Sequence, residues 1–531
     1  MKELLDLPDE IILAIINRIK PQFLLFYSLI GTGNNRLERI VLEKSHSLDL
    51  TFDYYKSPYE AFMKRFYAHV MPRIHNNIQF LAFNLQHLTD ISTFAQENCG
   101  GTLPNLTHLK IMMGKKCITT GTTFTLGNNL INKMRRQPLF SISSQFFDYE
   151  DVVMDQKISA FRCSSLMRSI ISFELDDNCI LPKLLTSDEL FFPQSPHLTH
   201  LRITLWSFDD CIRLLSQLGL QLRSFVVNLV FICIREYDTI PQMALIRCPN
   251  LKELTITNYR NTPQYDQCIL PLLQRLLTVE YLTLFLAIGV GRCAPNHFID
   301  GFYLDSDIIS YLPYLREFHF HIRSVLPYPH SKLDTIRQSV RRQQQSVDCV
   351  LDYFNNTYGQ CQIYSLPFIG TRLDFISNRF PIFDDKNTFS NVTTLLLFDD
   401  VQPFEDAFFR VIARALPYLK SLEVINQLEQ QEKTKTTTNF IEFTHLVTLI
   451  LSDIHIDYAE QLLYRTHLPH LVELFIHYEP LLAIVTEDQQ QARVNCSKIE
   501  LIRILELPDD DDLEYILNFF PNRFCQTSKK K

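Results

Sequence analysis

The 531-residue sequence lacks the short motifs that mark several large enzyme classes. It contains no GxSxG, HExxH, GxxxxGK[ST] or GxGxxG, and its 13 glycines are too dispersed to form a phosphate-binding loop. These absences argue against enzymes built on those motifs. We therefore expect a protein without catalytic activity and without a bound cofactor.

Long apolar runs and an excess of positive charge are also missing. The longest runs, FVVNLVF at 225–231 and LTLFLAIGV at 282–290, are shorter than the roughly 18 residues that span a bilayer. The chain has 51 lysines and arginines against 59 aspartates and glutamates, which gives a net charge of −8. We expect neither a membrane nor a nucleic acid as a partner.

The 13 cysteines, which run from Cys99 to Cys525, include no CxxC pair. An odd, scattered set fits neither a disulfide framework nor a zinc ribbon, whereas it does fit free thiols in a reducing compartment. Four acidic residues within the first ten positions also interrupt any secretory signal. The sequence therefore predicts a cytoplasmic and/or nuclear protein.

What the sequence does contain is a recurring leucine phrase. PNLTHLKI from Pro104 returns as PHLTHLRI from Pro196, PNLKELTI from Pro249, PYLREFHF from Pro313, PYLKSLEV from Pro417 and PHLVELFI from Pro469. Weaker copies fill the gaps between these phrases. Phrases that start at 392, 419, 446, 471 and 499 are 27, 27, 25 and 28 residues apart.

Each phrase predicts one short strand followed by a return helix. Leu109 and Ile111 alternate with His108 and Lys110, as in a strand with one buried face. The stretch FDDCIRLLSQLG at 208–219 places apolar residues at the i, i+3, i+4, i+7 spacing of a helix. A period of about 20 to 29 residues with the core L-x-x-L-x-L is typical of leucine-rich repeats.

The phrases, including RCPNLKEL around Cys248, resemble those of the cytosolic leucine-rich-repeat class found in ribonuclease-inhibitor-like and F-box proteins. This resemblance implies an α/β repeat solenoid, a leucine-rich-repeat horseshoe with parallel strands inside and helices outside. We expect the leucine-rich-repeat solenoid to cover residues 46–525, with segments at 112–169 and 325–391 that break the repeat period. Residues 526–531 are expected to form a disordered tail.

The first residues, LPDEIILAIINRI at 7–19 and PQFLLFYSLIG at 21–31, resemble the F-box, a small all-α module. The matching residues are Leu7, Pro8, Ile11, Ile12 and Ile15 in the first helix, with Leu24 and Leu25 in the second. The tryptophan common near the end of the module is absent from TGNNRLERIV at 32–41. The resemblance implies that residues 1–45 bind the Skp-type adaptor of a cullin ubiquitin ligase through these side chains.

Outward positions of the expected strands provide a surface for a protein substrate, because aromatic and charged groups dominate binding interfaces. The candidate target-binding residues are His108, Lys110, His200, Arg202, Glu253, Tyr281, Phe285, Glu317, His319, His321, Phe398 and Phe475. The pair His319 and His321 lacks a third ligand, so no metal is expected.

The resemblance predicts the substrate receptor of an SCF-type ubiquitin ligase. The alternative is a leucine-rich-repeat scaffold or inhibitor whose first helices only cap the stack. Exposure of Ile11, Ile12 and Leu24 would distinguish the two, because a cap buries these side chains and a docking module leaves them open.

Overall fold

A computed structural model describes the chain in two compact units. The first unit contains the described residues up to 112, from 165 to 283 and from 307 to 318, and the second contains 284–306 and the described residues from 319 onward. The described residues are 7–16, 18, 22–30, 34–42, 47–51, 59–112, 165–177, 179–181, 191–234, 239–291, 293–327, 333–340, 346–355, 358–381, 389–431, 441–487, 490–504, 516, 519–520 and 524–527.

Three short helices open the first unit: α1 (Asp9–Ile16), α2 (Gln22–Leu29) and α3 (Asn35–Leu42). Pro8 immediately precedes α1, and Asp9 and Glu10 occupy its first turn, where negative charge favours a helix N-terminus. Ile12, Phe26 and other apolar side chains of these helices are buried. Among these elements, α2 contacts both α3 and the strand that follows it, β1 (Ser47–Leu50).

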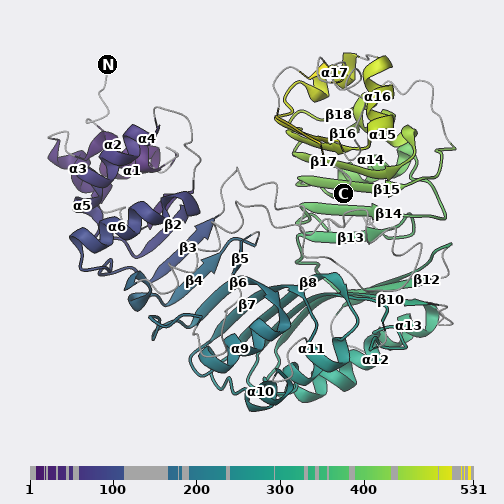
Figure 1. The fold of residues 1–531 in the computed structure, drawn as a ribbon, viewed down its shortest axis with the longest axis horizontal. Coiled ribbons are helices and arrows are strands. Elements are labelled where there is room, and N and C mark those ends of the chain that lie inside the picture. The colour runs from purple at the N-terminus through teal and green to yellow at the C-terminus, as the bar shows by residue number, and fades with distance from the viewer. Residues whose placement is uncertain are drawn as a thin grey trace. The chain divides into compact units, whose positions relative to one another are not determined.

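A large, mostly parallel sheet follows these helices (Figure 1). The strands that pair in parallel are β1 (Ser47–Leu50), β2 (Phe80–Asn84), β3 (His108–Met112), β4 (Ser172–Leu175), β6 (His200–Ser207), β7 (Ser224–Phe231) and β8 (Glu253–Thr262), with β5 (Ile180–Leu181) beside β6. The order continues through β9 (Tyr281–Ile288), β10 (Glu317–Pro327), β12 (Tyr358–Ser365) and β11 (Val347–Tyr353). This arrangement confirms the expected α/β class with parallel strands.

One buried apolar residue of each strand lies in the same row of the first sheet. The row contains Leu81, Leu109, Phe173, Leu201, Phe225 and Leu254, which the pairing register aligns. Because strand side chains alternate between faces, the aligned leucines face the helices and their neighbours face away.

Helices connect the strands of the first unit. They are α4 (Tyr59–Arg65), α5 (Met71–Ile74), α6 (Leu88–Asn98), α9 (Phe208–Leu218), α10 (Thr239–Leu245) and α11 (Tyr265–Leu273). In α9 the predicted apolar face of Cys211, Leu214, Leu215 and Leu218 is buried. The Ser207 hydroxyl accepts a hydrogen bond from the Asp210 backbone N–H and so caps this helix.

The second unit contains another parallel sheet, shown in green to yellow in Figure 1. Its strands, in order, are β13 (Arg372–Ile376), β14 (Thr394–Phe398), β15 (Ser421–Asn426), β17 (Thr448–Ile454), β19 (Glu473–Ile476), β20 (Leu501–Ile504) and β21 (Phe524–Thr527). A second aligned row contains Leu373, Leu395, Leu422, Leu449, Leu474 and Ile502, all buried. The remaining elements are α12 (Gly301–Tyr303), α13 (Leu333–Val340), α14 (Asp406–Ala415), α15 (Ile456–Tyr464), α16 (Tyr478–Glu487), α17 (Gln490–Cys496), β16 (Ile441–Glu442) and β18 (Thr466–His467).

The two expected period-breaking segments differ in how much of them is described. The segment 325–391 contains α13 and the hairpin of β11 and β12, and β12 pairs antiparallel with both β11 and β10. The parallel order starts again at β13. Residues 113–164 of the other segment and residues 528–531 of the expected tail lie outside the described residues.

Leu449→Ala tests the buried row of the second sheet. Leu449 is fully buried between Leu422 and Leu474, so the truncation leaves a cavity and is expected to lower the free energy of unfolding by about 2 to 5 kcal/mol. The measurement is urea denaturation followed by circular dichroism. The exposed neighbour Lys420→Ala should change stability by less than about 0.5 kcal/mol, and equal losses in the two variants would contradict the assigned faces.

Candidate functional site

The predicted adaptor-binding residues divide into an exposed and a buried set. Ile11 and Ile15 expose 48% and 41% of their surface and lie one turn apart on α1. Pro8 is exposed and Leu7 half-buried, so these four residues form an apolar stripe on one side of α1. Ile12 and Leu25 are buried and belong to the interior of the helical module, while the side chain of Leu24 lies outside the described set.

An arginine on α3 holds the start of this stripe in place. The Arg36 Nε donates to Asp9 Oδ1 at 2.8 Å, and an Arg36 terminal N–H donates to the backbone oxygen of Leu7 at 2.7 Å. Arg39 adds a contact of 3.3 Å to the same carboxylate. The hydrogen bond from Arg36 lowers the pKa of Asp9 below its ordinary value. The orientation of the stripe therefore depends on contacts between α1 and α3.

The predicted target-binding residues of the first unit share one face of the sheet. The register aligns His108, His200 and Glu253 in one row, and all three side chains are exposed. Tyr281 at the start of β9 is also exposed, as is Glu317 at the start of β10. These five residues offer polar and aromatic groups to solvent.

Carboxylates that the leucine phrases did not reveal neutralise the basic residues of this face. Lys110 Nζ lies 2.7 Å from Glu174 Oε1, and an Arg202 terminal nitrogen lies 3.1 Å from Asp177 Oδ2. Glu174 lies directly beside Lys110 and Arg202 in the strand register. Aligning the strands in the sequence would therefore have revealed this carboxylate. The early strands therefore present ion pairs on this face.

Other predicted target-binding residues lie deeper. Phe285 and His319 are half-buried, whereas His321 is buried with its Nε2 at 2.8 Å from Gln362 Oε1. Burial lowers the pKa of His321 to about 4, so the ring is neutral at pH 7. The described residues contain no group of three or more His, Cys, Asp or Glu side chains arranged to hold a metal ion.

Two predicted target-binding residues of the second sheet are covered in the folded chain. Phe398 and Phe475 expose only 6% and 4% of their surface. The Phe398 ring packs against Phe354 and Phe375 at centroid distances of 5.1 and 5.8 Å. The Arg503 guanidinium lies 5.4 Å from the centroid of Phe475. Neither phenylalanine is open to a partner in this state.

A buried carboxyl lies in the same row as Phe475. Glu423 accepts a hydrogen bond from the Ser452 hydroxyl at 3.0 Å and is 4% exposed. Burial raises its pKa to about 7, although Ser452 and Arg372 favour the ionised form. The alternation of strand side chains places Glu423 on the same face as Phe475 but carries no signal of its burial.

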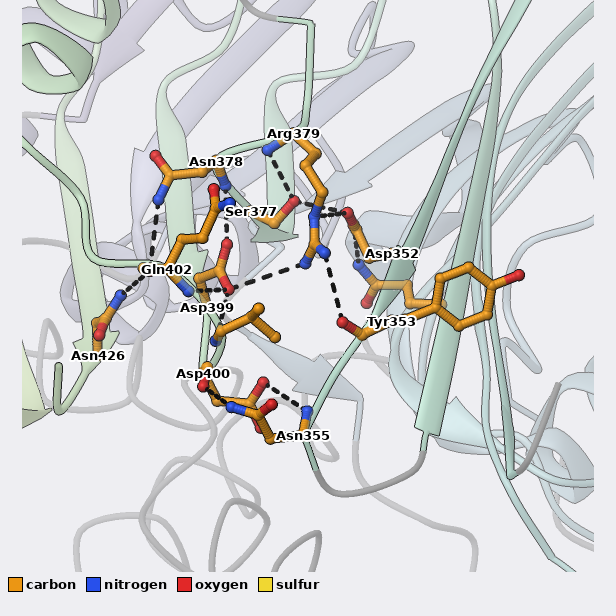
Figure 2. A network of polar contacts seen from close by, with 12 residues as sticks. Asp352, Tyr353, Asn355, Ser377, Asn378, Arg379, Asp399, Asp400, Gln402 and Asn426 are labelled. Carbon is orange, nitrogen blue, oxygen red and sulfur yellow. Dashed lines mark hydrogen bonds and ion pairs between the residues drawn. The ribbon is translucent and has the colours of Figure 1, made fainter. Parts of the chain in front are cut away.

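A network of polar side chains joins the hairpin to the second sheet (Figure 2). Arg379 Nε lies 3.0 Å from Asp352 Oδ1, and an Arg379 terminal nitrogen lies 3.8 Å from Asp399. The Ser377 hydroxyl also donates to Asp352, at 2.8 Å. Asp399 accepts the backbone N–H groups of Asn378, Val401 and Gln402. The two buried carboxylates are thus satisfied within the protein and act as structural groups.

Four buried cysteines of the described residues have raised thiol pKa values. Burial raises the pKa of the Cys248 and Cys496 thiols to about 12 and raises those of Cys211 and Cys268 further. A thiol is nucleophilic as the thiolate, which these environments disfavour. These four thiols are therefore weak nucleophiles in the folded protein.

Glu423→Gln tests the buried carboxyl through pH dependence. Since the folded pKa of about 7 exceeds the unfolded value of about 4.3, the contribution of Glu423 to stability is present below pH 4 and is lost as pH rises through 7. The neutral glutamine avoids this loss, so the variant should be more stable than the wild type by about 1 to 3 kcal/mol at pH 8 and no more stable at pH 4.

Urea denaturation across this pH range measures the difference between the two proteins. Glu500→Gln changes an exposed carboxyl of the same unit and should follow the wild-type profile. Parallel profiles for Glu423→Gln and the wild type would contradict the raised pKa.

Comparisons with known proteins do not identify a family for this chain. A scan against models of known protein families finds no match, and a search of curated proteins finds no similar sequence. In the part of the chain that the structure describes, no helix combines the length and the apolar character that crossing a bilayer requires.

Proposed function

We propose that the protein is a non-catalytic substrate receptor of an SCF-type ubiquitin ligase, in the cytoplasm and/or nucleus. Its first helices, an F-box-like module, would bind the Skp-type adaptor, and a leucine-rich-repeat solenoid would hold a target protein. The observation that supports the proposal is the apolar stripe, in which Pro8, Ile11 and Ile15 are exposed and Leu7 is half-buried. Ile12 on the same helix is buried.

The side chains chosen to separate docking from capping divide: Ile11 is exposed, as a docking module requires, whereas Ile12 is buried, as in a cap. A helix that only shields the end of a stack turns its apolar face inward, whereas two isoleucines on α1 remain about half exposed. Contiguous apolar surface on a folded module indicates a binding site, because burial of such surface in a complex is favourable. The buried Ile12 packs inside the protein, while Ile11 and Ile15 provide a second apolar side of α1 that is exposed to a partner.

The regular strand register supports the solenoid. Side chains near the start of each strand also reach back to the preceding phrase: Asn250 Nδ2 donates to the Leu220 oxygen at 2.7 Å, and Lys498 Nζ donates to the Pro469 oxygen at 2.7 Å. Both bonds join positions about one phrase apart in sequence. Stacked units in which each contacts its neighbour are the defining property of repeat proteins.

The target would bind the exposed face of the first unit. His108, His200, Glu253, Tyr281 and Glu317 are accessible there, whereas His321, Phe398 and Phe475 would have to be uncovered first. A receptor of this kind acts by tethering, since holding the target near the ligase raises its effective concentration. No residue of the receptor needs to take part in the chemistry.

Ile11→Asp with Ile15→Asp tests adaptor binding. Two charges on the open stripe should weaken binding to a purified Skp adaptor by at least about 100-fold, because each aspartate would be buried without a partner in the complex. Isothermal titration calorimetry measures the affinity, and circular dichroism should show unchanged folding because both side chains are exposed.

Two further variants serve as controls. Ile369→Asp with Val494→Asp changes two exposed apolar residues of the second unit and should leave adaptor binding intact. Ile12→Asp should unfold the helical module because Ile12 is buried. If the intact chain does not bind the adaptor, the receptor proposal fails and a capped leucine-rich-repeat scaffold or inhibitor remains.

A further inference from the structure

Exposed leucines and arginines recur in the three successive segments that precede β7, β8 and β9, on loops and at the end of α10. Leu220, Leu245 and Leu277 expose 67%, 78% and 49% of their surface, and apolar side chains that gather in one patch, unlike single ones, indicate a binding surface. Each stands two or three residues from an exposed arginine. We call this set the leucine-arginine ledge, and its residues are Leu220, Arg223, Leu245, Arg247, Arg275 and Leu277.

The three segments of the ledge are joined to one another. Asn250 Nδ2 donates to the Leu220 oxygen at 2.7 Å, which connects the loop before β8 to the loop before β7. An Arg275 terminal nitrogen donates to the Ala244 oxygen at 2.8 Å and connects the loop before β9 to the end of α10. The exposed leucines therefore belong to one continuous surface, and not to three unrelated positions.

The ledge carries a local positive charge on a chain whose net charge is −8. Arg223, Arg247 and Arg275 form no ion pair with a carboxylate of the described chain. Beside them Lys252 and Arg316 share a single carboxylate, Glu280, at 2.7 and 3.1 Å. Positive charge therefore exceeds negative charge along this edge of the sheet.

Neighbouring loops expose different side chains. The loop before β6 exposes Pro196 with His197 at its tip, whereas the loop before β4 exposes Arg168 with Ile171. On the other side the surface continues into the loop before β10, where Tyr311 and Tyr314 are exposed. Arginine and aromatic residues together are the composition of protein-binding hot spots.

We propose that the leucine-arginine ledge binds an acidic segment of a partner protein that also carries apolar side chains. Charge complementarity selects the acidic segment, and the exposed leucines bury apolar side chains once it is bound. The guanidinium group favours carboxylates because it presents paired N–H donors. A second copy of the chain does not fit ledge to ledge, because arginines would then face arginines.

A protein is favoured over an anionic membrane as the partner. The ledge has three arginines on three separate segments, whereas sites for anionic lipids typically have about four to eight lysines and arginines clustered on one segment. The proposal does not depend on adaptor docking, because the ledge contains none of the residues of the α1 stripe. Its failure would leave the proposed receptor function untouched.

The test uses the full chain and a fluorescent synthetic peptide of repeated Leu-Glu-Glu-Leu units. Fluorescence anisotropy should show saturable binding that weakens as salt is raised from about 50 to 500 mM, because salt screens charge pairs. Arg223→Glu with Arg247→Glu should weaken binding by at least about tenfold through like-charge repulsion. Leu245→Ser with Leu277→Ser should weaken it to a similar extent through lost apolar contact.

Control variants and control ligands separate the ledge from general charge effects. Arg414→Glu with Lys420→Glu reverses two exposed charges of the second unit and should leave peptide binding unchanged. Peptides in which serine replaces leucine, or lysine replaces glutamate, should bind at least about tenfold more weakly. Absence of binding, equal binding of all peptides, or binding only to vesicles of phosphatidylserine and phosphatidylcholine would overturn the proposal.

Discussion

The alignment of one buried apolar residue per strand is the constraint on which the rest of this protein depends. In the first sheet Leu109 and Leu201 flank Phe173, and in the second Leu422 and Leu474 flank Leu449. A slip of one residue would turn such a row to the opposite face of its sheet. The register therefore fixes which side chains pack against helices and which remain for contacts on the other face.

Much of this architecture could be predicted from the sequence, because the leucine phrases and the apolar face of α9 are local signals. Local signals do not reveal what covers a surface. The alternation that places Phe398 and Phe475 on the outward face is the same whether that face is open or covered. The same holds for Ile11 and Ile12, which are the same residue type at adjacent positions of α1. Folding exposes Ile11 and buries Ile12, and the sequence does not show which is which.

Residues whose partners come from another strand were the hardest to assign. Glu174 neutralises Lys110 from a position 64 residues away, and the hairpin of β11 and β12 carries no leucine phrase. Phe375 has a positive φ of 56° at a register shift in β13, and its carbonyl accepts from Gln360 and Gln362 while Arg323 lies over its ring. Such contacts hold the irregular backbone, because a non-glycine residue adopts this conformation only when its surroundings support it.

The buried thiols could report local unfolding of the protein through their reaction with an alkylating reagent. Cys211 and Cys268 lie in return helices, Cys349 and Cys361 in the antiparallel hairpin, and Cys496 in α17. Each becomes accessible to an alkylating reagent only when its own segment separates from the protein. Exposed Cys293, by contrast, is accessible without any opening. The pattern of modification with time would therefore rank the segments of each unit by their local stability.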